Sequence, residues 1–307
     1  MIDLSKFDSL FSLSDYFNTE ERCKKVLLEQ RWGDVVACPV CGSVHVYKRR
    51  NYRFSCADCN HTFSVTSGTI FDNTKISLRK WFMAMYLISS HKKGVSSVQL
   101  ATDIKVTQKT AWYMLHKIRH LYGQTVESLA GRVEMDEMYL GGKETNKHKS
   151  KRVEGTQGRS TKTKTPIFGM VEREGSVKAL AVSDTKVETL MPIIKQYVYE
   201  HSEVFTDELS SYSKLAEHGY THSVVYHHQE EYAVGDNYTN TIEGFWAQFR
   251  RMVYGVYHFI SRKYLQRYID EEVYRWNTKE ADAGVRFAYM FGMCVGKYDY
   301  QCVRNVA

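Results

Sequence analysis

The order of apolar and polar positions divides the chain into a helical first part and a mixed second part. Apolar residues at helical spacing predict a short helical segment over residues 1–35 and three further helices within residues 76–123. A short turn at Ile104–Val106 separates the second of these three helices from the third. This arrangement favours a helix-turn-helix segment, and an ordinary three-helix bundle with a solvated basic face is the alternative.

The third of these helices carries the side chains that a helix-turn-helix would present to DNA. Residues at the N-terminal end of such a helix contact base edges in the major groove. The candidate DNA contacts are Gln108, Lys109 and Thr110. Further basic residues along or beyond the helix are Lys117, Arg119 and His120.

Strand patterns begin at Arg132–Gly142, where apolar residues alternate with acids and a glycine pair ends the pattern. Asp136 lies at the far end of this strand. Ile167–Val171 and Val177–Val182 predict a hairpin, and Val204–Asp207 predicts a short strand that again ends on a carboxylate.

The remaining pattern completes an α/β domain. Helices are predicted over Val187–Tyr199, over Leu215–His218 and from Asn240 to Phe259, and a strand is predicted at Val224–Tyr226. The order of three β segments, helix, strand, helix, strand and helix predicts a mixed sheet of ribonuclease-H type over residues 130–280. Residues 281–307 form a C-terminal tail in this scheme, and the chain as a whole is predicted to be a multidomain α/β protein.

Four of the seven cysteines form two Cys-x-x-Cys pairs, a pattern that a secreted disulfide framework explains poorly. The four residues are Cys38, Cys41, Cys56 and Cys59. Two such pairs at this separation can hold one zinc ion tetrahedrally, so residues 36–66 are predicted to form a zinc ribbon with Gly42 in its first tight turn. A redox dithiol would need only one pair. The four-thiolate shell leaves no open position for a substrate, so this zinc is expected to be structural.

The charge of the chain favours a polyanionic partner. Its 42 Lys and Arg residues exceed 35 Asp and Glu residues by seven, and 22 Tyr, 14 Phe and 5 Trp add flat aromatic faces. Basic charge alone fits a membrane surface equally well. However, the sequence contains no run of 18 apolar residues and no signal peptide, so we expect a protein of the cytosol and nucleoid in a bacterium, or of the nucleus in a eukaryote.

The densest run of positive charge follows the glycine pair at Gly141. From Lys143 to Thr165 the chain has almost no apolar residue, which predicts a flexible loop that becomes ordered on a phosphate backbone. The candidate DNA contacts in this loop are Lys143, Lys147, Lys149, Lys151 and Arg152.

Three acids are candidates for a catalytic metal site. Cutting or joining a phosphodiester with two Mg²⁺ or Mn²⁺ ions requires carboxylate oxygens, which such hard ions prefer. Asp136, Asp207 and Glu243 are the acids that fit, because the predicted fold returns all three to one edge of the sheet. Glu134 and Glu137 are interpreted as solvated groups or as groups that support the ligands.

Three motifs together point to a known family: Arg31–Trp32 before Cys38–Gly42, Glu134–Gly142, and Asn240–Trp246. In these motifs the chain resembles the IS1595 (ISXO2-like) insertion-sequence transposases, and the match covers most of its length. The resemblance implies a zinc ribbon, a DNA-binding helical segment and a DDE-type core that cleaves transposon ends and transfers their 3′-hydroxyls to target DNA. It also implies double-stranded DNA as the partner, with at least two catalytic subunits assembled on the terminal inverted repeats.

The resemblance places the first two acidic positions on Asp136 and Asp207. Members of this family are described with either Glu or Asn as the third ligand, and the matching motif here contains both Asn240 and Glu243. The carboxylate of Glu243 offsets a divalent charge better than an amide, which favours Glu243.

A basic region follows this motif. Relatives usually carry Lys seven residues after the Glu, whereas this chain has Arg250, which keeps the cation for phosphate positioning but changes its geometry. Arg251 is a further candidate DNA contact. The DNA-facing surface is predicted to continue through His258, Lys263, Arg267 and Tyr268.

Two rival functions remain open at this stage. One is a structure-specific nuclease on the same fold, which would cleave DNA without rejoining the ends to a target. The other is a zinc-ribbon DNA-binding or regulatory protein derived from an inactive transposase.

Overall fold

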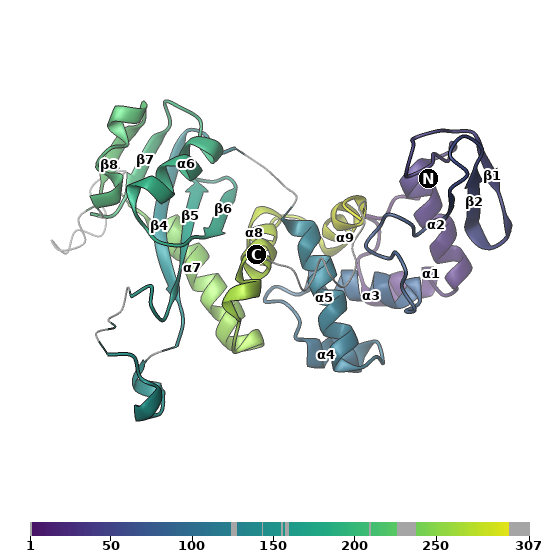
Figure 1. Ribbon diagram of the computed structural model, residues 1–307, viewed down its shortest axis with the longest axis horizontal. Helices are drawn as coiled ribbons and strands as arrows, with labels where there is room; N and C mark the ends of the chain where they lie inside the picture. Colours follow the sequence, from purple (N-terminus) through teal and green to yellow (C-terminus); the bar gives the residue numbers. More distant parts are fainter. Residues whose placement is uncertain are drawn as a thin grey trace. The chain divides into compact units, whose positions relative to one another are not determined.

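The computed structural model describes residues 2–123, 128–142, 144–154, 156, 160–208, 210–225 and 238–294. The chain separates into two compact units (Figure 1). The first unit consists of Met1–Tyr122 and Thr278–Ala307, and the second of Gly123–Asn277. Among the described helices, none has both the length and the apolar character needed to cross a membrane.

Two helices open the first unit, α1 (Leu10–Tyr16) and α2 (Glu20–Trp32). Each begins at a hydroxyl N-cap, which satisfies a backbone N–H that has no partner inside the helix. Ser9 caps α1, and the Oγ1 of Thr19 accepts the N–H of Arg22 at 3.3 Å at the start of α2. Both helices lie within residues 1–35, the stretch for which a helical segment is predicted.

A three-stranded antiparallel sheet follows α2, in the order β1-β2-β3. Its strands are β1 (Val46–Lys48), β2 (Arg53–Cys56) and β3 (Thr62–Ser64). Gly42 adopts a φ of +76° in the turn before β1, a backbone conformation that glycine tolerates without strain. The buried core of this small sheet consists of Cys38, Phe54, Cys56 and Phe63. Only four residues form this buried core and two of them are cysteines, so the cysteines are part of what holds the small sheet together.

Four helices complete the first unit. The three that were predicted within residues 76–123 are α3 (Leu78–Ser90), α4 (Ser97–Asp103) and α5 (Gln108–Tyr122). The fourth, α9 (Ala283–Gly292), lies in the stretch that the sequence marked as a tail. Its aromatic residues pack on α3, with ring centroids 5.0 Å apart for Phe82 and Phe291.

A five-stranded mixed sheet forms the centre of the second unit, in the order β6-β5-β4-β7-β8 (Figure 1). Its strands are β4 (Arg132–Leu140), β5 (Thr165–Glu172), β6 (Val177–Ala181), β7 (Glu203–Thr206) and β8 (Thr221–Val224). β4, β5 and β6 pair antiparallel, whereas β4, β7 and β8 pair parallel. β4 is thus the strand at which the sheet changes direction.

Helices cover both faces of this sheet. On one face α7 (Asn240–Met252) and α8 (Leu265–Asn277) pack through a core that includes Trp246, Phe249 and Ile269. On the other face α6 (Val187–Tyr197) packs through a core that includes Leu190 and Ile194.

Along β4, Val133 and Met135 face the core on the α6 side, whereas Met138 and Leu140 face the core on the α7 and α8 side. The polar residue between the first two, Glu134, is buried as well.

Two predicted boundaries in this unit are wrong. The last strand is Thr221–Val224 rather than Val224–Tyr226, because its partner β7 ends where Thr206 pairs with Val224; Tyr226 lies outside the described residues. The helix from Asn240 stops at Met252 and continues only as a π-helical turn, Val253–Tyr257. Phe259 beyond it is 79% exposed and does not extend the apolar face of α7.

Candidate metal centre and nucleic-acid surfaces

The parallel pairing of β4 with β7 brings two of the predicted acids together. Glu134 pairs with Phe205, and the same register two residues further on places Asp136, in the middle of β4, beside Asp207, which directly follows β7. Carboxylate oxygens of Asp136, Glu137 and Asp207 all lie within 4.8 Å of one another. Each of these side chains is half-buried, so the cluster is open to solvent on one side.

The electrostatics of this cluster favour a bound cation. Burial raises the pKa of Asp136 to about 6, the backbone N–H of Glu137 opposes the rise, and the negative charges of Asp207 and Glu243 add to it. Carboxylates that repel one another in this way are relieved by a divalent ion, and oxygen is the donor that Mg²⁺ and Mn²⁺ prefer. The donor set therefore fits a hard divalent metal.

Glu137 belongs to the cluster, which the sequence did not indicate. It was interpreted as solvated or supporting, but its carboxylate is half-buried beside those of Asp136 and Asp207. The hydroxyl of Tyr212, itself fully buried, donates a hydrogen bond to Glu137 Oε1. Tyr212 could not be found from sequence spacing, because it lies 75 residues further along the chain.

Glu134 is fully buried, so the solvated alternative is wrong for this residue. Its Oε2 atom accepts the backbone N–H groups of Thr241 at 2.8 Å and Ile242 at 3.0 Å. These groups belong to the first turn of α7, where the partial positive charge of the helix attracts a carboxylate. These hydrogen bonds connect the N-terminus of α7 to Glu134 of β4.

Helix α7 carries the remaining predicted site residues. Asn240 is its first residue and Glu243 lies in its first turn, and both are exposed. The charge of Glu243 reaches Asp136, as the pKa of Asp136 shows. Arg250 and Arg251 are exposed in the last turn, and Arg250 lies seven residues from Glu243, which places both on one side of the helix.

The predicted DNA contacts on α5 have mixed outcomes. Gln108 and Lys109 are exposed and Thr110 is half-buried at the start of the helix, so all three stay predictions. In contrast, Lys117 and Arg119 are only 2% and 1% exposed, and Lys117 Nζ donates to the carbonyl of Ile70 at 2.8 Å. These two side chains lie on the packed side of α5 and cannot face DNA.

A similar correction applies beyond α7. Arg267 and Tyr268 are only 5% and 8% exposed, because nearly the whole of α8 is buried. His258 and Lys263 remain exposed, and they keep their place in the predicted surface.

The basic loop between β4 and β5 contains two short 3₁₀ turns, Glu144–Asn146 and Lys149–Lys151. Lys149, Lys151 and Arg152 are exposed and Lys147 is half-buried, whereas Lys143 lies outside the described residues. Arg152 also stabilises the loop itself, since its Nη2 donates to the carbonyl of Thr145 at 2.8 Å.

The four cysteines of the two Cys-x-x-Cys pairs form a second cluster among the described residues. The Sγ atoms of Cys38 and Cys59 lie 3.6 Å apart, as do those of Cys41 and Cys56. The backbone N–H of Cys59 stabilises the Cys56 thiolate and lowers the pKa of Cys56 to about 7. Spacing and chemistry fit the closed shell of a structural zinc ribbon.

The last two residues of α2, Arg31 and Trp32, contact the ribbon. The indole of Trp32 meets the rings of Phe54 and Phe63 edge-on, with centroids 5.9 Å away in each case. Arg31 stacks on Trp32 at 4.1 Å and donates to the carbonyl of Val65 at 2.9 Å. The Arg31–Trp32 motif therefore has a packing role.

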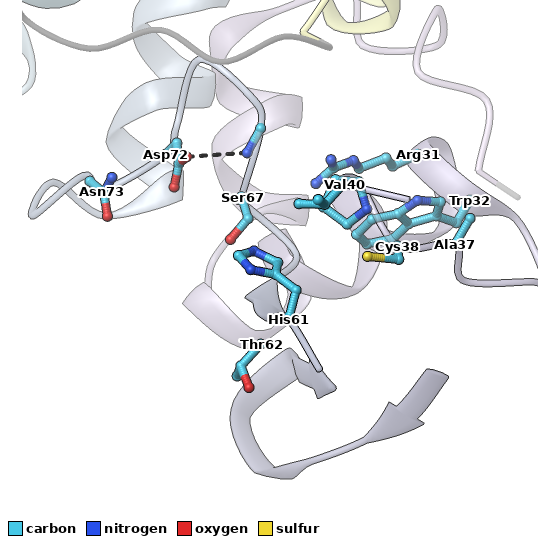
Figure 2. A pocket seen from close by; sticks show the side chains of 12 residues that line it. Arg31, Trp32, Ala37, Cys38, Val40, His61, Thr62, Ser67, Asp72 and Asn73 are labelled. Carbon is cyan, nitrogen blue, oxygen red and sulfur yellow. Dashed lines mark hydrogen bonds between the residues drawn. The ribbon is translucent and has the colours of Figure 1, made fainter. Parts of the chain in front are cut away.

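A pocket of about 700 Å³ lies beside this junction (Figure 2). Arg31, Trp32 and His61 line it, and Asp72 accepts the N–H of Gly68 at its rim at 3.2 Å. The ring of His61 stacks on Phe63, and the cluster of potential ligands contains only cysteines. The pocket shares no residue with the acidic cluster, so it is no part of that candidate site.

A four-cysteine ribbon in one unit and a carboxylate cluster on a mixed sheet in the other define the class: a zinc-ribbon protein with an acidic α/β domain. Comparison with known families agrees with this class. Residues 128–277 match the ISXO2-like transposase domain, and residues 18–62 match the transposase zinc-ribbon domain. The chain belongs to the ISXO2-like (IS1595) transposase family.

Two curated relatives support this membership. The chain is 30% identical over 285 residues to an uncharacterized protein in transposable element ISH50 of Halobacterium salinarum. The aligned region covers 86% of this chain and 95% of that protein. It is also 30% identical over 104 residues to an uncharacterized transposase-like protein of Haemophilus influenzae. This aligned region covers 34% of this chain and 83% of that protein.

Proposed function

We propose that this protein is a DDE-type DNA transposase that cleaves transposon ends and transfers their 3′-hydroxyls to target DNA. The observation that carries the proposal is the parallel register of β4 and β7, which sets Asp136 beside Asp207, with the charge of Glu243 close enough to affect Asp136. The strand order β6-β5-β4-β7-β8, antiparallel on one side of β4 and parallel on the other, supports a ribonuclease-H-type core.

The chain's own residues have distinct tasks in this proposal. Asp136 and Asp207 hold Mg²⁺ or Mn²⁺, and Glu243 completes the set, with Asn240 as the alternative third ligand. Divalent ions held by these residues would supply activation of the attacking oxygen and stabilisation of the leaving oxygen of the phosphodiester. Glu137, oriented by Tyr212, is a further acid close enough to accept a proton or to share a ligand position. Arg250 positions a phosphate from the same side of α7.

DNA binding is assigned to three basic surfaces. The contacts proposed for transposon ends and target are Gln108, Lys109, Thr110, Lys143, Lys147, Lys149, Lys151, Arg152 and Arg251. Contacts of Lys and Arg with phosphate act through counterion release, so binding weakens as salt rises. Assembly of at least two chains on the DNA would bring two ends to one target.

The test is a cleavage and strand-transfer assay on cognate terminal repeats with Asp136→Asn and Asp207→Asn. Each change removes a metal-binding charge at nearly constant volume, so both activities are expected to fall by about 1,000-fold or more while DNA binding is retained. Glu200→Gln, an exposed acid of the same unit, serves as the control and should leave activity unchanged. Full activity in both Asp variants would disprove the site.

Two further outcomes separate the rival functions. Cleaved ends that are never joined to a target would identify a nuclease. DNA binding without any cleavage in Mn²⁺, even by the unaltered chain, would identify an inactive transposase-derived DNA-binding protein. The third ligand is decided by comparing Glu243→Ala with Asn240→Ala, of which the first should lose more activity.

A further inference from the structure

Arg173, the residue that follows β5, is buried at the junction of three segments. Its Nε donates to Glu134 Oε1 at 2.8 Å, and the two side chains are only 7% and 0% exposed. Its Nη2 donates to the carbonyl of Tyr238 at 2.6 Å. Its guanidinium also stacks on the rings of Phe205 and Tyr238, at 3.9 and 3.8 Å.

Each segment that Arg173 touches carries a proposed ligand two residues further on. Glu134 precedes Asp136 in β4, and Phe205 precedes Asp207 at the end of β7. Tyr238 likewise precedes Asn240, the first residue of α7, and Glu243 follows within the same turn. One side chain therefore contacts all three parts of the chain that must converge at the acidic cluster.

Glu134 extends this arrangement into α7. Thr239, the N-cap residue of α7, makes no side-chain cap hydrogen bond. The carboxylate of Glu134 takes its place by accepting the N–H groups of Thr241 and Ile242, and it also accepts the hydroxyl of Thr241 at 3.0 Å. The position of the first turn of α7, and with it that of Glu243, is thus coupled to the ion pair.

A general contribution to the stability of the fold does not explain why a buried Arg–Glu ion pair occupies this position. The cost of removing two charges from water offsets much of their attraction, and apolar residues in the same space are often as stabilising. What arginine adds is a flat, rigid fork that can donate in two directions while both of its faces stack on rings. Those properties determine the distances between the segments that it joins.

We propose that Arg173, together with Glu134, is a positioning residue that sets the spacing of three ligand-bearing segments: the middle of β4, the end of β7 and the start of α7. This inference rests on the proposed metal-dependent function. It concerns the geometry of the metal site and assigns Arg173 no contact with DNA or with the reacting atoms.

The experiment measures Mn²⁺ binding to the full chain, loaded with zinc and free of DNA, by electron paramagnetic resonance. Arg173→Lys keeps the charge opposite Glu134 but loses the second donor direction and the flat stack. We expect Mn²⁺ affinity to fall by about tenfold, the scale seen when groups that orient metal ligands are changed. The thermal unfolding temperature of the variant, loaded with zinc but free of Mn²⁺, should stay close to that of the wild type.

The matched control is Arg132→Lys. Arg132 pairs with Glu203 at 3.5 Å and so joins the same two strands, β4 and β7, but the two side chains are 51% and 40% exposed. This variant should bind Mn²⁺ as the wild type does. Tyr238→Leu provides a milder test, because it removes one stacked ring while the main-chain acceptor remains; it should weaken Mn²⁺ binding by a smaller factor.

The outcomes distinguish this inference from the function on which it rests. Absence of Mn²⁺ binding in the wild type would overturn both. Wild-type affinity in Arg173→Lys and Tyr238→Leu, with Mn²⁺ bound normally by the unaltered chain, would overturn the positioning role alone. If Arg173→Lys does not fold, the affinity of Tyr238→Leu decides the question.

Discussion

Single buried polar residues shape the second unit more than its exposed charges do. Glu134 and Arg173 are one example, and Glu272 of α8 is another. Glu272 is 1% exposed, and its Oε2 atom has no hydrogen-bond partner among the described residues. Burial raises the pKa of Glu272 to about 7, although Arg275 and Arg251 lower it in part.

Glu272→Gln is therefore expected to stabilise the protein in a pH-dependent way. A carboxyl group whose pKa is raised from 4.5 to about 7 on folding favours the folded state at low pH, and this contribution is lost as pH rises between those two values. The loss amounts to roughly 3 kcal/mol. Denaturant unfolding should show the variant more stable than the wild type at pH 8, with a much smaller difference at pH 5.

The control for this prediction is Glu217→Gln, which removes one negative charge from an exposed position of the same unit. Its stability difference from the wild type should not show the same growth between pH 5 and pH 8. If the difference in stability between Glu272→Gln and the wild type did not change with pH, it would contradict the prediction that the ionised carboxylate of Glu272 destabilises the folded state.

At the scale of elements, the contact of α7 with the sheet determines whether a site can form. Gly169 of β5 pairs directly with Asp136, and the indole of Trp246 lies over it. A Cβ at this position would meet Trp246 Cζ2 at 2.5 Å and Ile242 Cδ1 at 3.0 Å. Glycine is required here because α7 approaches the sheet so closely.

We expect Gly169→Ala to push α7 outward and to destabilise the second unit by about 1–3 kcal/mol, the usual cost of overpacking a core. Because α7 carries Glu243, metal-dependent cleavage should fall as well, even at temperatures where the variant is folded. Unfolding curves and cleavage rates measure the two effects. Gly142→Ala is the control, since a Cβ there meets nothing within 4 Å; equal stability of both variants would disprove the close contact.

At the scale of the whole molecule, two clusters of potential metal ligands with different chemistry lie in separate units. The first unit presents four soft thiolates, and the second presents hard carboxylate oxygens. Two of the four clustered cysteines, Cys38 and Cys56, are also half of the buried ribbon core, whereas the sheet of the second unit has large apolar cores on both faces. Loss of metal should therefore have different structural consequences in the two units.

Removal of zinc by a strong chelator is expected to unfold the ribbon and leave the second unit folded. Hydrogen exchange should show full loss of protection over residues 46–64 and unchanged protection in β4 and β5. Cys56→Ser should behave like the chelated protein. Cys23→Ala is the control, because Cys23 is buried in α2 outside the cluster and its loss should release no zinc; protection of the ribbon after chelation would contradict a structural role for the metal.

Sequence alone determined the features that depend on short spacing. The cysteine pairs and the strand that ends just before Asp207 were predictable, because each depends on residues only a few positions apart. Asp136 was expected at the far end of its strand, but β4 continues to Leu140, because β5 pairs with it over that whole length. The predicted order of strands and helices along the chain then favoured a mixed sheet, which contains both parallel and antiparallel strand pairs. Helix faces were less predictable: Lys117, Arg119, Arg267 and Tyr268 are buried because of what packs against their helices, which no local pattern records.

Only the tertiary structure decided how the acids of β4 divide their roles. Glu134 reaches Ile242 across 108 residues and Arg173 across 39, and Glu137 reaches Tyr212 across 75. Contacts of this kind form only when the sheet register and the docking of α7 are both in place, and neither can be read from local spacing. Asp136 was therefore visible in the sequence, whereas its supporting residues were not.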